Sequence, residues 1–258
     1  MSRPSWKGDH IALGTNTDPY QWVEKRYGLM RGIWEAMRDA SNPCSILTKS
    51  PLVLRDADLL VEIARTQVSA CLSIPTMDEK AWRASEPHTP HPRARLEAVK
   101  ELNRLGVPTG VLVAPLMPGI NDAPEQVDKV LDACREAGAV SIGGQALFLA
   151  GSTKAVFMDW LRGYRPDLVP EYERLYERRS RLRAEDRARV EAPLRAHRRR
   201  RTEPRFGRAL EGSAATGDVS TAAEAATGLS AAPPASPGRA PLSPEDRAAA
   251  LRGQAALF

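Results

Sequence analysis

Polar side chains of complementary charge follow three apolar segments of this 258-residue chain, at the points where predicted strands end. Thr17 and Asp18 follow the first segment, Lys49 follows the second, and Ser73 lies near the end of the third. Hydroxyl and carboxylate oxygens accept hydrogen bonds from an ammonium group, whereas a lysine and a serine hydroxyl can donate to a carboxylate. The four side chains together therefore suit a zwitterionic small molecule.

Further polar side chains extend this pattern along the same predicted edge. They are Thr15, Asn16, Thr48, Ser50, Thr76, Asp78, Asn121, Asp122 and Gln145. Each of them alone has a simpler explanation, because Ser, Thr, Asn and Asp at strand ends also cap helices. Lys49 has no such simpler explanation, because a charged side chain directly after a buried strand needs an anionic partner or a path to solvent.

Five βα units account for the positions of these side chains. Strand-like runs occupy 10–14, 45–48, 70–74, 109–114 and 140–145, and helical patterns fill 23–40, 54–66, 92–105 and 124–137, with another helix starting at 156–161. Several strand-like runs show little alternation, which is typical of parallel strands covered on both faces. The sequence therefore predicts an α/β fold: five parallel strands in an open, curved sheet, helices on its outer face, and a polar rim at the carboxyl ends of the strands.

The positive charge of the chain is concentrated in one segment. The formal net charge is +5, but residues Arg178–Arg208 hold 13 arginines and four acidic residues. A charge run of this kind is often only a solvated helix. The alternative is binding of nucleic-acid phosphates, to which arginine is well suited. Because Phe206 is the only aromatic residue in the segment, we expect such binding to be mainly electrostatic, with little base stacking.

The composition changes again towards the end of the chain. Residues 170–201 are helix-prone, whereas from about Thr202 the chain is rich in Ala, Gly, Pro, Ser and Thr. Such a stretch buries too little apolar surface to offset its ordering entropy. We predict a barrel domain at 1–176, an Arg-rich helical extension at 177–208 and a disordered tail at 209–258, with one short helix at Ser243–Phe258.

The remaining features indicate a cytoplasmic protein with no membrane span. Residues Met1–His10 are polar, and no apolar run approaches the length needed to cross a bilayer. The cysteines at 44, 71 and 134 match no short metal or cluster spacing, so we expect buried, reduced thiols. His88 and His91 alternate with prolines, which favours an exposed loop over a metal site.

Six segments of the chain, read together, resemble one enzyme superfamily. They are Gly14–Gln21, Leu47–Ser50 with Leu54–Asp56, Ser73–Ile74 with Thr76–Asp78, Glu86–Pro87 with Arg95–Leu96, Val113–Pro115 with Pro118–Asp122, and Phe157–Leu161. They resemble the radical S-adenosylmethionine (SAM) superfamily, and within it the spore-photoproduct-lyase-like, or DNA-repair-photolyase-like, branch. The resemblance covers roughly residues 5 to 176.

The resemblance implies a fold, two cofactors and a set of binding residues. The fold would be a partial (β/α) barrel of the radical SAM type that lacks its first βα unit. The cofactors would be SAM and a [4Fe–4S] cluster, which together cleave SAM reductively to a 5′-deoxyadenosyl radical. By motif, Thr17 and Asp18 would hold the SAM amino group, and Lys49 and Ser73 its carboxylate. Arg95 is a candidate for a second anion contact, with a solvated helix face as the alternative.

The cluster motif of that superfamily is missing from this sequence. Three cysteines in a Cys-x3-Cys-x2-Cys loop normally hold the cluster, and no two cysteines here have that spacing. The simplest explanation is a truncated and inactive family member, and a natural paralogue without a cluster is the second. Two further hypotheses stay open: a non-enzymatic nucleic-acid-binding protein that uses the Arg-rich segment, and a βα-barrel enzyme unrelated to SAM. The sequence assigns no catalytic residue, no substrate and no oligomeric state.

The missing motif leads to a direct prediction about iron. Three thiolates must converge on one cluster, so this chain alone should bind no [4Fe–4S] cluster. Anaerobic reconstitution followed by iron and sulfide analysis is the measurement. A stoichiometric cluster with the usual broad visible absorption would show the prediction to be wrong.

Overall fold

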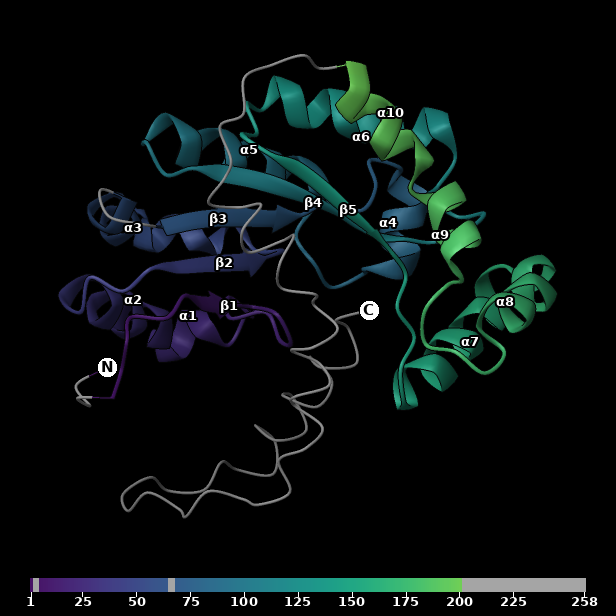
Figure 1. Cartoon of the computed structure of the whole chain (residues 1–258), viewed down its shortest axis with the longest axis horizontal. Coiled ribbons are helices and arrows are strands. Elements are labelled where there is room, and N and C mark those ends of the chain that lie inside the picture. Colours follow the sequence, from purple (N-terminus) through teal and green to yellow (C-terminus); the bar gives the residue numbers. More distant parts are fainter. Residues whose placement is uncertain (2–4, 65–67, 201–258) are drawn as a thin grey trace. The chain divides into compact units, whose positions relative to one another are not determined.

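Five parallel strands form a single open sheet. The computed structural model describes residues 1, 5–64 and 68–200 of the chain. The strands are β1 (Ile11–Leu13), β2 (Cys44–Thr48), β3 (Val68–Ser73), β4 (Thr109–Leu116) and β5 (Ile142–Ala146). They pair in the order β1-β2-β3-β4-β5, and every pair is parallel. The carboxyl ends of all five strands therefore lie at the same end of the sheet (Figure 1). The predicted parallel sheet is confirmed.

Helices connect successive strands, and further helices follow β5. Their bounds are α1 (Glu24–Tyr27), α2 (Leu29–Asp39), η1 (Pro51–Asp56), α3 (Ala57–Ala64), α4 (Glu79–Ser85), α5 (Pro92–Arg104), α6 (Pro124–Glu136), α7 (Ser152–Tyr164), η2 (Pro166–Leu168), α8 (Val169–Tyr176), α9 (Ala184–Val190) and α10 (Ala192–Arg200). The expected helices at 92–105 and 124–137 agree with α5 and α6. Helix α4 was not expected from the sequence.

The single helix expected at 23–40 is wrong, because the chain breaks at Gly28. Gly28 has a φ of 59°, in the left-handed region that ends helices. The Glu24 carboxylate then accepts hydrogen bonds from the backbone N–H groups of Leu29 (3.0 Å) and Met30 (2.9 Å). The first N–H groups of a helix have no partner within that helix. The Glu24 side chain therefore caps the N-terminus of α2.

Two other helical predictions also need correction. The segment expected as one helix at 54–66 begins as the 3₁₀ helix η1, where Ser50 Oγ accepts from the Leu52 N–H and Pro51 follows. The helix-prone stretch 170–201 divides into α8, α9 and α10. The predicted disordered tail and the short helix at Ser243–Phe258 lie outside the described residues.

The sheet buries one face more completely than the other. Along β2 and β3, buried residues such as Ile46, Ala70 and Leu72 alternate with half-buried ones such as Leu47 and Cys71. The buried series packs with helix residues in one core. Within the described residues, both faces of these strands are therefore covered, one fully and the other in part.

The last helices of the described chain pack against the sheet. Val190 and Leu194 are buried, and a Cβ placed on Gly144 in β5 would lie 2.2 Å from Leu194 Cδ1. Glu191 Oε1 accepts a hydrogen bond from the Ala146 N–H at 3.3 Å. Helices α9 and α10 are thus docked on β5, and α10 also runs beside α6 (Figure 1). Among the described residues no helix is long and apolar enough to cross a membrane.

Gly14 allows the chain to pass closely over β2 after it leaves β1. Its φ is +87°, and a Cβ there would lie 1.9 Å from the Leu47 carbonyl oxygen. Gly14→Ala should lower the free energy of unfolding by more than about 2 kcal/mol, because a positive φ alone costs a side chain roughly 1–2 kcal/mol. Urea denaturation measures this change.

Gly32→Ala is the matched control. Gly32 lies in α2, and a Cβ there meets nothing within 4 Å. This substitution should raise the free energy of unfolding by about 0.5–1 kcal/mol. Equal effects of the two substitutions would contradict the steric argument for Gly14.

Candidate functional site

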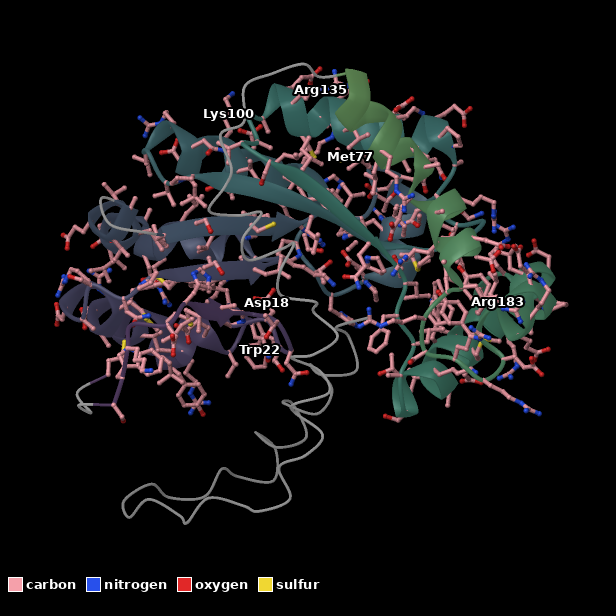
Figure 2. The ribbon with its side chains drawn as sticks, in the orientation of Figure 1. Asp18, Trp22, Met77, Lys100, Arg135 and Arg183 are labelled. Atoms are coloured by element: carbon pink, nitrogen blue, oxygen red, sulfur yellow. The ribbon has the colours of Figure 1, made fainter. Side chains whose placement is uncertain are left out.

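Asp18 joins the loop after β1 to the carboxyl end of β2. Its Oδ1 accepts hydrogen bonds from the Thr48 hydroxyl (2.6 Å) and the Tyr20 N–H (2.9 Å), and its Oδ2 accepts from the Lys49 N–H (2.7 Å). The residue lies at the edge of the sheet where the strands end (Figure 2). A carboxylate has about four acceptor positions, so one position on Oδ2 remains for a ligand. Thr17, directly before it, is exposed.

Glu86 is the anionic partner that the sequence predicts for Lys49. The Lys49 Nζ lies 2.8 Å from Glu86 Oε1, and the two side chains are 18% and 3% exposed. The contact is a close ion pair, and Glu86 Oε1 has no other polar partner within the described residues. Sequence reasoning noted Glu86 only as part of a motif and did not identify it as this partner.

Arg95 neither lies on a solvated helix face nor is positioned to contact a ligand, so both sequence-based interpretations of it are wrong. Its side chain is fully buried in α5, and Nη2 lies 2.7 Å from Glu86 Oε2. Nη1 donates to the Ser73 carbonyl at 2.7 Å, and Nε donates to the Pro90 carbonyl at 2.8 Å. Arg95 therefore holds the end of β3, the loop before α5 and Glu86 together.

The Lys49–Glu86–Arg95 cluster contains one carboxylate between two cations. Burial by itself would raise the pKa of Glu86, but the charges of Lys49 and Arg95 outweigh burial and hold that pKa below its ordinary value. Glu86 is therefore ionised at neutral pH. The cluster has a net charge of +1, and the partly exposed member is Lys49.

Ser73 is less available than its predicted role requires. Its hydroxyl donates to the Ala114 carbonyl at 3.0 Å and so connects β3 to β4. The hydroxyl oxygen can still accept a hydrogen bond. To donate to a carboxylate, as predicted, the hydroxyl would have to leave Ala114.

Several other polar residues of the predicted rim have structural roles. Asn121 is buried and donates to the Pro75 and Pro115 carbonyls, both at 3.0 Å. Asp78 Oδ1 accepts from the Ala81 N–H at 2.7 Å and caps α4, and Asp122 accepts from the Gly119 N–H at 2.7 Å. The helix-cap interpretation of such residues is therefore correct for Asp78.

A second buried polar network is centred on Tyr20, two residues after Asp18. The Tyr20 hydroxyl donates to Asp56 Oδ2 and accepts from Trp34 Nε1, both at 2.8 Å. Arg55 Nη2 pairs with Asp56 (2.7 Å) and Glu24 (2.8 Å). Burial raises the pKa of Tyr20, so the phenol stays protonated. The network fixes the loop that carries Thr17 and Asp18.

Metal ligands do not gather in the described part of the chain. No group of three or more His, Cys, Asp or Glu side chains in it could hold a metal ion. Burial raises the pKa of the thiols, to about 11 for Cys44 and about 12 for Cys71 and Cys134. A [4Fe–4S] cluster needs three converging cysteines, and no three of these thiols converge within the described residues, so they do not fit such a cluster. Two of them are buried as predicted, and Cys71 is half-buried.

Comparison with known proteins finds relatives of unknown function. No family model matches the chain. It is 42% identical over 179 residues to uncharacterized proteins of Mycobacterium tuberculosis and Mycobacterium bovis, an alignment that covers 69% of this chain and 53% of those proteins. A protein of Acidianus two-tailed virus is 33% identical over 149 residues, or 57% of this chain and 48% of that protein. The chain thus spans about half the length of these relatives.

Solved structures identify the fold. A variant of spore photoproduct lyase, a radical SAM protein, aligns with a TM-score of 0.53 and 14% identity, over 74% of this chain and 58% of that one. Streptococcus suis SuiB bound to S-adenosylmethionine aligns with a TM-score of 0.41 and 16% identity, over 64% and 36%. The lyase structure shows that this chain shares the α/β fold of that radical SAM protein.

The cluster around Glu86 should be essential for stability. Arg95→Met would leave Glu86 buried with Lys49 alone and would free the Ser73 and Pro90 carbonyls. Removing one partner of a buried ion pair costs roughly 3–5 kcal/mol, and we expect a loss of this size in urea denaturation. Arg93→Met, at an exposed position of the same helix, should change stability by less than about 0.5 kcal/mol. Similar unfolding free energies for both variants would contradict this account.

Proposed function

We propose that the edge formed by Asp18 and Lys49 binds the methionine part of SAM. The observation that carries the proposal is the charge arrangement around Glu86. Arg95 already neutralises Glu86, so the charge of the partly exposed Lys49 remains available for a ligand carboxylate. The free acceptor position of Asp18 suits the ligand ammonium, and the exposed Thr17 directly precedes it in the chain.

The fixed geometry of these groups supports the same proposal. The Asp18 side chain is bonded to the Lys49 backbone, so the distance between the two opposite charges is set before a ligand arrives. A site that is ordered in advance spends little binding energy on ordering side chains. Ser73 adds an acceptor in this position, or a donor if its hydroxyl turns away from Ala114.

We further propose that the protein belongs to the radical SAM enzymes. Reductive cleavage of SAM would then be the reaction of a family member that also holds the iron–sulfur cluster. The described residues do not fit an iron–sulfur cluster, and we derive no step through one. For this chain alone the proposed activity is SAM binding without cleavage. The alternative function is nucleic-acid binding without catalysis.

The proposal predicts a specific coupling between Lys49 and the ligand carboxylate. SAM should bind to the purified chain in titration calorimetry, and decarboxylated SAM should bind at least tenfold more weakly, a difference of about 1.4 kcal/mol. Lys49→Met should weaken SAM binding by the same factor but leave the affinity for decarboxylated SAM within about threefold, because the interaction is already absent.

Lys100→Met is the control for the loss of a positive charge. Lys100 lies on α5, is exposed, and is away from the strand ends (Figure 2). This variant should bind both compounds as the unchanged chain does. Equal affinity of the unchanged chain for the two compounds, or an equal loss for both in Lys49→Met, would contradict the assignment of Lys49.

A further inference from the structure

Four arginines lie close together in the loop between α8 and α9. They are Arg178, Arg179, Arg181 and Arg183, and the segment Arg178–Arg183 contains no acidic residue. We call this segment the arginine loop. Within the described residues none of its arginines has an ion pair. Most other arginines there do, for example Arg31, Arg38 and Arg104.

Hydrogen bonds hold the arginine loop against the chain that leaves β5. The Leu149 N–H donates to the Ser180 carbonyl at 2.8 Å, and the Tyr176 hydroxyl donates to the Leu147 carbonyl at 2.8 Å. Lys154 Nζ donates to the Glu177 carbonyl at 2.9 Å, and Leu182 is buried. The loop backbone is thus anchored on both sides, which lowers the entropy lost when its arginines bind a ligand.

The loop also places an arginine over an exposed aromatic ring. Arg181 Cζ lies 4.9 Å from the ring centroid of Phe148, which is 36% exposed and follows β5 by two residues. Sequence reasoning expected little base stacking, because Phe206 was the only aromatic residue in the Arg-rich segment. The fold brings Phe148, which lies outside that segment, to the arginines, a contact that the sequence did not indicate. An arginine and an aromatic ring side by side form a surface on which bases stack.

This surface lies at the same end of the parallel sheet as the candidate SAM site, but next to the opposite outer strand. Phe148 follows β5 at the same edge of the parallel sheet where Asp18 and Lys49 follow β1 and β2. Figure 2 shows Arg183 beyond that edge, between α8 and α9.

We propose that the arginine loop and Phe148 bind single-stranded nucleic acid, with the arginines on phosphates and Phe148 under a base. Arginine favours phosphate because its planar fork makes two hydrogen bonds at once. The aromatic ring favours a chain with unpaired bases over a duplex or a lipid surface, neither of which offers a base to stack. This proposal does not depend on SAM binding and fails or succeeds separately from it.

Fluorescence anisotropy with a labelled single-stranded oligothymidine tests the arginines. Arg178→Gln with Arg179→Gln and Arg183→Gln should weaken binding at least tenfold at 50 mM salt, and should make the salt dependence shallower by about two in log–log slope. The control combines Arg93→Gln, Arg104→Gln and Arg162→Gln, which removes the same charge from exposed positions on α5 and α7. It should change the affinity by less than threefold.

Phe148→Leu tests the stacking surface, because leucine keeps the apolar volume but has no ring. It should weaken single-strand binding by about fivefold or more and leave duplex binding within twofold. Circular dichroism confirms that each variant is folded. Absence of binding at low salt, equal losses in the two triple variants, an unchanged affinity in Phe148→Leu, or tighter binding to vesicles with anionic lipids than to the oligonucleotide would overturn the proposal.

Discussion

The need to neutralise the buried carboxylate of Glu86 is the constraint on which the carboxyl ends of β2 and β3 depend. An ionised carboxylate away from water is strongly unfavourable unless cations and hydrogen bonds surround it. Arg95 and Lys49 supply those cations from α5 and from the end of β2. Because Arg95 also binds the Ser73 carbonyl, the requirement to neutralise one charge fixes the positions of two strand ends and of the loop before α5.

The same constraint explains why Lys49 remains suited to a ligand although it already has a partner. With one carboxylate between two cations, the cluster attracts an anion only at its partly exposed end. Asp18 is placed beside that end by its bonds to Thr48 and to the Lys49 backbone, which in turn need Gly14 to let the chain pass over Leu47. Charge, close packing and loop path are therefore coupled, and a change in any of them should disturb the others.

The positive charge beyond β5 has a different physical character. The arginines of the arginine loop have no ion pair within the described residues, and the loop backbone is held by hydrogen bonds rather than by a helix. The Lys49 site is small and balanced to within one charge, so it suits a small zwitterion. The arginine loop is unbalanced and lies over an exposed ring, so it suits an extended polyanion with aromatic bases.

The sequence by itself determined the βα order, the five parallel strands, the polar residues at the strand ends and the need of Lys49 for an anion. These follow from local signals, namely apolar runs, helix-stop glycines and a charge next to a buried strand. Only the tertiary structure decided that Glu86 is that anion, that Arg95 is buried, that the Ser73 hydroxyl is bonded to Ala114, and that Phe148 meets Arg181. Each of these pairs is brought together by the sheet or by helix docking, and contacts between residues far apart in the chain leave no periodic pattern in the sequence.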